Sequence, residues 1–98
     1  MQAIQVFPEN LVKIQDWCPD ALFYIDREKV IDLSEDCLKE YRKNMSICVL
    51  MSDGKFFAIN QCWIVKHDDG TFTTMTDQLF RYKYEPVPGS FPDVRKKG

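Results

Sequence analysis

The chain has 98 residues, which is enough for one domain with a small hydrophobic core and too few for two. Hydrophobic residues make up 45% of the chain and charged residues 29%, so we expect an ordered globular protein and not a disordered one. The net charge of −2 argues against a nucleic-acid-binding protein. No apolar run approaches the roughly 20 residues that a helix needs to span a bilayer.

The first quarter of the chain predicts a strand, a helix and a second strand. Residues 3–7 alternate weakly between apolar and polar side chains, as a half-buried strand does. Asn10 is a favourable N-cap for a short helix over residues 11–17, where apolar side chains recur at helical spacing. Pro19 ends that helix, because the residue before a proline disfavours helical backbone. The apolar run at residues 21–25 predicts the next strand.

The middle of the chain predicts one helix and one β-hairpin. Residues 30–31 favour a short extended piece, and the acidic start of residues 34–44 is typical of a helix. Residues 47–51 and 55–59 are apolar runs separated by a turn at residues 53–54, which are Asp and Gly. Asp-Gly between two such runs is a strong hairpin signal, because both residues tolerate positive φ.

The last third predicts a second hairpin, one helical turn and a final strand. Residues 62–65 and 71–75 flank a turn at residues 67–70, and β-branched side chains favour a strand after it. Thr76 is expected to cap a short helical turn. Residues 84–87 supply the last extended segment.

These elements predict an α+β fold, in which a small antiparallel sheet with two β-hairpins carries one or two short helices on one face. We expect the sheet mainly from residues 46–87, and a single domain over residues 1–87. Residues 88–98, rich in proline and ending in basic residues, are expected to form an extended or disordered C-terminal tail. The predicted core consists of Ile4, Val6, Leu11, Ile14, Trp17, Phe23, Ile25, Leu38, Val49, Phe57, Trp63, Val65, Phe72, Phe80 and Tyr84.

Several short motifs follow one another in a recognisable order. They are Ala3-Ile4-Gln5, Glu9-Asn10-Leu11, the Asp53-Gly54 turn, Trp63-Ile64-Val65-Lys66, Gly70, Phe72, and Phe80 followed by Tyr84-Glu85-Pro86-Val87. This ordered set resembles a widespread family of small bacteriophage and prophage proteins with a Pro-Gly-Asp-Trp-Ile type motif. The resemblance covers both ends of the chain, and the middle, from about residue 18 to residue 44, matches poorly.

The chain departs from this family at its most typical point. Where Pro-Gly-Asp would precede Trp63, the chain has Asn60, Gln61 and Cys62. Asn60 is expected to support the turn there, because asparagine tolerates left-handed backbone. The resemblance implies a small α+β domain encoded by a phage and acting in the bacterial cytoplasm. Members of the family generally lack an assigned function, so the resemblance implies a setting more than a chemistry.

The residues do not form a catalytic or metal-binding set. The single histidine, His67, lies in a charged turn beside Asp68 and Asp69, where a solvated turn residue is expected and not a rigidly held base. Two adjacent carboxylates fall far short of the six or more oxygens that calcium requires. The glycines are isolated, so no phosphate-binding loop is present. We therefore predict no enzyme activity, no metal and no cofactor.

The cysteines are predicted to be buried thiols. Cys18, Cys37, Cys48 and Cys62 contain no closely spaced pair, which a structural zinc site usually needs. Free cysteine in apolar strand context packs as a small hydrophobic residue.

The aromatic residues of the last third are candidates for a binding surface. Alternation along the second hairpin predicts that Trp63, Val65 and Phe72 share one face, with Tyr84 alongside. Two interpretations stay open, namely a core face covered by helices and an aromatic platform for a ligand or partner. The candidate ligand- or partner-binding residues are Asn60, Gln61, Trp63, Lys66, Phe72 and Tyr84.

Three functions of different classes follow from these observations. The first is a phage-encoded, non-enzymatic accessory protein that binds a host bacterial protein and acts in host takeover or as an anti-defence inhibitor. The second is a small-molecule binder that sequesters a nucleotide-like signal, and an enzyme ranks last. The start of the chain lacks the features of a signal peptide, so we expect a cytoplasmic protein with no membrane partner. Exposed edge strands leave a homodimer open.

Overall fold

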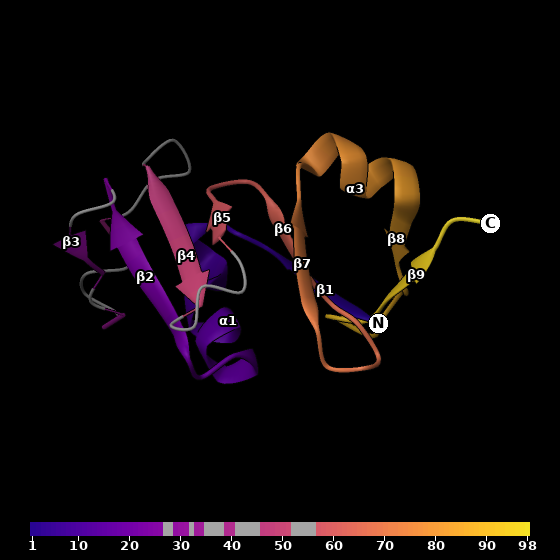
Figure 1. Ribbon diagram of the computed structural model, residues 1–98, viewed down its shortest axis with the longest axis horizontal. Helices are drawn as coiled ribbons and strands as arrows, with labels where there is room; N and C mark the ends of the chain where they lie inside the picture. Colours follow the sequence, from indigo (N-terminus) through magenta and orange to yellow (C-terminus); the bar gives the residue numbers. More distant parts are fainter. Residues whose placement is uncertain (27–28, 32, 35–38, 41–45, 52–56) are drawn as a thin grey trace.

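The computed structural model describes residues 1–26, 29–31, 33–34, 39–40, 46–51 and 57–98. The helix predicted at 34–44, the core residue Leu38 and the Asp53-Gly54 turn fall wholly or largely outside them, as does the side chain of Phe57. The described part has the predicted α+β fold, with its strands divided among three antiparallel sheets and not gathered in one. The molecule is elongated, with principal extents of 40 × 27 × 22 Å (Figure 1).

The helices and strands follow one another along the chain in largely the order that the sequence predicts. The strands are β1 (Gln2–Gln5), β2 (Ala21–Ile25), β3 (Lys29–Val30), β4 (Ile47–Met51), β5 (Phe57–Ile59), β6 (Trp63–Lys66), β7 (Phe72–Met75), β8 (Tyr84–Pro86) and β9 (Val94–Lys96). The helical elements are the 3-10 turn η1 (Pro8–Asn10), α1 (Leu11–Trp17) and α3 (Asp77–Lys83).

The two described helices begin where their capping residues predict. Thr76 caps α3 with its side chain, because its Oγ1 accepts a hydrogen bond from the Leu79 N–H at 3.2 Å. Asn10 occupies the N-cap position of α1, but its side chain does not accept from the helix. Its Nδ2 donates instead to the carbonyl of Gln5 at 2.9 Å. Asn10 therefore ties the start of α1 to the end of β1.

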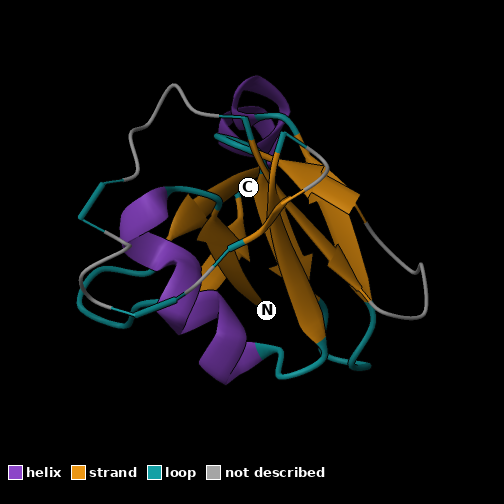
Figure 2. Cartoon of the chain, turned by 90° about the vertical axis from the view of Figure 1, so that its left-hand side faces the viewer, coloured by secondary structure: helices purple, strands orange, loops and turns teal. Residues whose placement is uncertain are grey.

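The four-stranded sheet occupies the left-hand end of the molecule in Figure 1. Its strand order is β3-β2-β4-β5, and β4 and β5 pair antiparallel, which confirms the first predicted hairpin. Seen from that end, α1 lies along one side of the strands (Figure 2). Leu11 and Ile14 of α1 are fully buried in the same cluster as Phe23 of β2 and Val49 of β4.

The central sheet joins distant parts of the chain. Its strand order is β1-β6-β7, so the first strand pairs with one that begins about sixty residues later. The β6–β7 pairing confirms the second predicted hairpin. Its turn closes at Gly70, which has a φ of 86° that favours glycine.

The C-terminal segment is part of the fold and not a free tail. Residues 88–98 were expected to be extended or disordered, yet β9 pairs antiparallel with β8 and Val94 is buried. The same segment lies against β1, where the Ala3 N–H donates to the Pro92 carbonyl and the Val94 N–H donates to the Met1 carbonyl, both at 3.0 Å. These contacts cover the outer edge of β1, which would otherwise be an open, unpaired strand edge.

The central sheet separates two hydrophobic clusters. On one face, Ile4 and Ile64 pack with α1 and the four-stranded sheet, in a cluster that we name the α1 core. On the other face, Ala3 and Val65 pack beneath α3 and β9, in a cluster that we name the α3 core. Successive residues of a strand point to opposite faces, so β1 and β6 each contribute to both clusters.

Most of the predicted core residues occupy these clusters. Nine are buried and belong to one of the two clusters, namely Ile4, Val6, Leu11, Ile14, Phe23, Val49, Val65, Phe80 and Tyr84. Four others, Trp17, Ile25, Trp63 and Phe72, are partly buried against a cluster.

Candidate functional site

The predicted binding residues do not gather on one face. In the β6–β7 hairpin, Trp63 lies opposite Met75 and Lys66 lies opposite Phe72. Directly opposed residues of an antiparallel pair share a face, so Trp63 and Phe72 point to opposite faces. The prediction that they share one was wrong. Alternation within each strand was right, but the register between strands depends on the turn, and a shift of one residue reverses the face.

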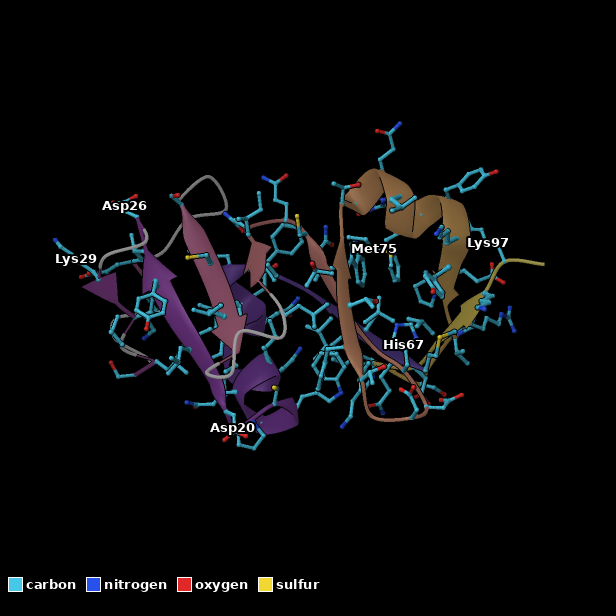
Figure 3. The ribbon with its side chains drawn as sticks, viewed as in Figure 1. Asp20, Asp26, Lys29, His67, Met75 and Lys97 are labelled. Carbon is cyan, nitrogen blue, oxygen red and sulfur yellow. The ribbon has the colours of Figure 1, made fainter. Side chains whose placement is uncertain are left out.

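Trp63 and Tyr84 are brought together by Phe80 of α3. The Trp63 and Phe80 rings stack with centroids 3.7 Å apart and an angle of 6° between their planes. The Tyr84 ring also stacks on Phe80, with the ring centroids 5.5 Å apart. Met75 points into the same space between β7 and α3 (Figure 3). Such ring pairs add stability beyond the area that they bury.

Asp77 holds this aromatic group through a set of converging donors. Its carboxylate accepts from Trp63 Nε1 at 2.9 Å, from Arg81 Nε at 3.0 Å and from Gln5 Nε2 at 3.3 Å. The hydrogen bond from Trp63, followed by the hydrogen bond and charge of Arg81, lowers the pKa of Asp77 below its ordinary value. Asp77 thereby links α3 to both β6 and β1.

Asn60 and Gln61 form the backbone connection between β5 and β6. The Asn60 N–H donates to the Ile47 carbonyl and the Gln61 N–H to the Val6 carbonyl, both at 2.7 Å. Gln61, and not Asn60 as expected, has left-handed backbone, with a φ of 75°. The Gln61 carbonyl also accepts from Gln5 Nε2 at 2.9 Å. These contacts fix the chain path between two sheets.

Lys66 and Phe72 lie on the face of the central sheet that points toward α1. The Lys66 ammonium is 5.8 Å from the centre of the Phe72 ring, within the range of a cation–π contact. Phe72 meets Trp17 of α1 edge to face, with centroids 5.6 Å apart. Phe72 is therefore a packing residue between β7 and α1.

A groove lies beside Trp63, and the sequence did not predict it. It has a volume of about 510 Å³. Its lining consists of Ala3, Trp63, Pro86, Val87, Pro88, Gly89, Phe91, Pro92, Asp93 and Val94. We name it the Trp63 groove. The side chain of Phe91 is 63% exposed, and the Lys13 ammonium lies 4.9 Å from its ring centre.

The Trp63 groove went unpredicted because most of its wall comes from the segment that was expected to be a tail. Prolines remove backbone donors and ordinarily mark irregular chain. The signal that was available is the pair of apolar residues Phe91 and Val94, which a solvated tail has no reason to contain.

His67 and the three described cysteines are not part of the lining of the Trp63 groove, and Cys37 lies outside the described residues. His67 Nε2 is 2.9 Å from Thr73 Oγ1 across the β6–β7 turn (Figure 3). Cys18 and Cys48 are buried thiols outside any disulfide, and burial, with the nearby charge of Asp20, raises the pKa of Cys18. Cys62 is a half-buried free thiol. Within the described ranges, no three His, Cys, Asp or Glu side chains are grouped to hold a metal ion.

No helix among the described residues is both long and apolar enough to cross a membrane.

Comparison of the chain with protein-family models, with characterised protein sequences and with solved structures finds no significant match.

Proposed function

We propose that this chain is a non-enzymatic phage accessory protein that binds a host bacterial protein in the host cytoplasm through the Trp63 groove. The observation that carries the proposal is an apolar groove of about 510 Å³ with a mostly exposed phenylalanine at its wall. The phage setting is supported by the resemblance in the motifs around Trp63 and Tyr84.

The lining of the Trp63 groove suits an apolar side chain of another protein. Tryptophan is enriched among the residues that dominate protein interfaces, and an exposed apolar surface gains free energy when a partner removes it from water. Pro86, Pro88 and Pro92 have restricted backbone, so the groove wall loses little conformational entropy on binding. Trp63 is held in place by Phe80 and Asp77, which preorganises the floor of the groove.

The charge of the chain favours a basic partner. Asp93 is the charged residue in the lining of the Trp63 groove, and the chain as a whole has a net charge of −2. Complementary charge speeds association and suppresses wrong partners. An acidic domain with an apolar groove fits a host surface that presents an apolar side chain among basic ones.

The test is affinity purification of the tagged chain from phage-infected bacteria, followed by mass spectrometry. We expect one host protein to co-purify in a fixed ratio with the unaltered chain. The Phe91→Ala variant should no longer co-purify with that host protein, because the substitution removes the exposed apolar wall without changing either core. Val30→Ala is the matched control, since Val30 is 72% exposed on β3 at the other end of the molecule (Figure 1).

Two results would contradict the proposal. One is the absence of any host protein above background. The other is a captured protein that Phe91→Ala and Val30→Ala retain equally well, which would place the contact outside the Trp63 groove.

A further inference from the structure

The β8–β9 hairpin carries one cross-strand ion pair, and a second pair of charged residues, both lysines, lies next to it. Glu85 lies opposite Arg95, and Arg95 Nε donates to the Glu85 carboxylate at 2.9 Å. Just beyond the paired strands, the Lys97 N–H donates to the carbonyl of Lys83, the last residue of α3, at 2.9 Å, so these two lysines are neighbours. Like charges on neighbouring residues repel. The second pair is electrostatically unfavourable in the chain alone.

The neighbouring carboxylates are already engaged. Glu85 is paired with Arg95, and Asp77 is paired with Arg81 at 3.0 Å. Within the part of the chain that the structure describes, no carboxylate pairs with Lys83, Lys96 or Lys97. Residues 77–98 contain five Lys or Arg and three Asp or Glu, the reverse of the balance in the whole chain. Positive charge is therefore concentrated at one end of an acidic molecule.

A hollow of about 810 Å³ lies among these lysines. Its lining consists of Tyr82, Lys83, Tyr84, Glu85, Lys96, Lys97 and Gly98. Tyr82 extends from α3 with 80% of its surface exposed, whereas Tyr84 is anchored in the α3 core. Lys97 lies at the right-hand end of the molecule, beside β8 (Figure 3). Three cations and an exposed aromatic ring thus border one space.

We propose that this hollow, which we name the lysine hollow, binds a small phosphorylated ligand that carries a planar ring, such as a nucleoside triphosphate. The lysine ammonium groups donate charge-assisted hydrogen bonds to phosphate oxygens, which removes the repulsion between Lys83 and Lys97. The Tyr82 ring stacks on the base.

The lysine hollow gives the nucleotide-like ligand a different place from the one that the sequence predicted. Lys66 lies on the face of β6 opposite to Trp63, whereas lysines and an aromatic ring line the same space here. The hollow and the Trp63 groove have no lining residue in common. Its test is therefore independent of the host-protein proposal.

The test is isothermal titration calorimetry of the full chain at low ionic strength with ATP, inorganic triphosphate and adenosine. We expect saturable binding of ATP and of triphosphate, with ATP about fivefold or more tighter because of the stacked base. Adenosine should bind too weakly to detect, because it lacks phosphate. Raising the salt concentration should weaken both interactions.

Single substitutions assign the contacts. Lys83→Ala and Lys97→Ala should each weaken ATP and triphosphate by about tenfold, the loss expected for a charged hydrogen bond. Tyr82→Ala should weaken ATP to the level of triphosphate and leave triphosphate unchanged. Lys29→Ala is the matched control, because Lys29 is an exposed lysine at the opposite end of the molecule (Figure 3).

Thermal unfolding of each variant without ligand checks that it folds, and loss of one of these two neighbouring lysines should leave the midpoint unchanged or slightly higher. Absence of saturable binding to ATP and triphosphate would overturn the proposal. An equal loss in Lys29→Ala would also overturn it, because the affinity would then come from general charge. Binding to single-stranded oligonucleotides with no binding to ATP would replace the small ligand with nucleic acid.

Discussion

Among the described residues, Asp26 and Gln61 have left-handed backbone although they carry a β-carbon, and glutamine tolerates it less well than aspartate. Gln61 has a φ of 75° between β5 and β6, where its N–H and carbonyl both form hydrogen bonds. Left-handed backbone costs a residue with a β-carbon about 1–2 kcal/mol, and glycine avoids that cost.

Gln61→Gly should therefore stabilise the protein. The side chain of Gln61 is exposed, and glycine relieves the strain at the cost of a more flexible unfolded chain. We expect the free energy of unfolding in urea to rise by about 0.5–1 kcal/mol. Asn60→Gly, one residue earlier and without positive φ, should lower it. A lower stability for Gln61→Gly would show that the side chain matters more than the backbone.

Asp77 makes stability depend on pH. Its pKa is lowered in the folded protein by Trp63, Arg81 and Gln5, so its ionised form adds stability at a pH above the unfolded value of about 4. That contribution is lost as the pH falls through the lower, folded pKa. Since the side chain is 39% exposed, screening by water limits it to about 1 kcal/mol or less.

Asp77→Asn should remove this part of the acid sensitivity. Urea unfolding at several values between about pH 6 and pH 2 should show a shallower decline for the variant than for the unaltered chain. Asp16→Asn, which changes an exposed carboxyl on α1, should keep the original decline. Parallel curves for all three proteins would exclude Asp77 as the source.

At the scale of elements, the C-terminal strand β9 closes the α3 core. Val94 is buried in one cluster with Ala3, Val65 and Phe80. β9 pairs with β8, and the backbone of residues 92–94 is hydrogen-bonded to that of residues 1–3. A chain that ended after residue 87 would lose this cover and expose the edge of β1.

Truncation after residue 87 should destabilise the protein. The buried valine alone is worth about 1.5–3 kcal/mol, and the lost backbone pairing adds to this. We expect a loss of at least about 2 kcal/mol in urea unfolding. Val94→Ser in the full chain removes the apolar side chain but keeps the strand, so the free energy of unfolding should fall by only part of that amount. An unchanged unfolding midpoint after truncation would restore the view of residues 88–98 as a tail.

Local signals predicted the elements well wherever a turn or cap had a definite chemistry. Thr76 placed the start of α3, Pro19 placed the end of α1, and Gly70 placed the β6–β7 turn. The register between β6 and β7 could not be predicted from such signals. Trp63 and Phe72 each alternate correctly within their own strand, and alternation does not say which residues of the two strands are opposed. The Trp63 groove was also beyond such signals, since its wall meets its floor only after β8 and β9 pair.

At the scale of the whole molecule, the central sheet is the common wall of both cores. Ile64 and Val65 are neighbours in β6 and are both fully buried, yet they face different cores. Neither core can lose its packing without exposing one face of this sheet. The two cores should therefore unfold together.

The two tryptophans report on this coupling. Trp17 packs against the α1 core and Trp63 against the α3 core, so Trp17→Phe and Trp63→Phe leave one fluorescent probe in each. We expect the urea transition of each single-tryptophan variant to coincide with its own transition followed by circular dichroism. Fluorescence that leads or lags circular dichroism would show that one core unfolds without the other.

The sequence by itself determined the α+β class, the position of the β6–β7 turn and of the helix caps, and the burial of most of the residues predicted for the core, because these depend on backbone preferences and on hydrophobic spacing within short segments. Tertiary structure decided the pairing of β1 with β6, the division into two cores, the role of the C-terminal segment, the Trp63 groove and the lysine hollow. Each of these depends on contacts between residues far apart in the chain, such as Ala3 with Pro92 and Trp63 with Phe80. Local preference carries no information about which distant surfaces meet.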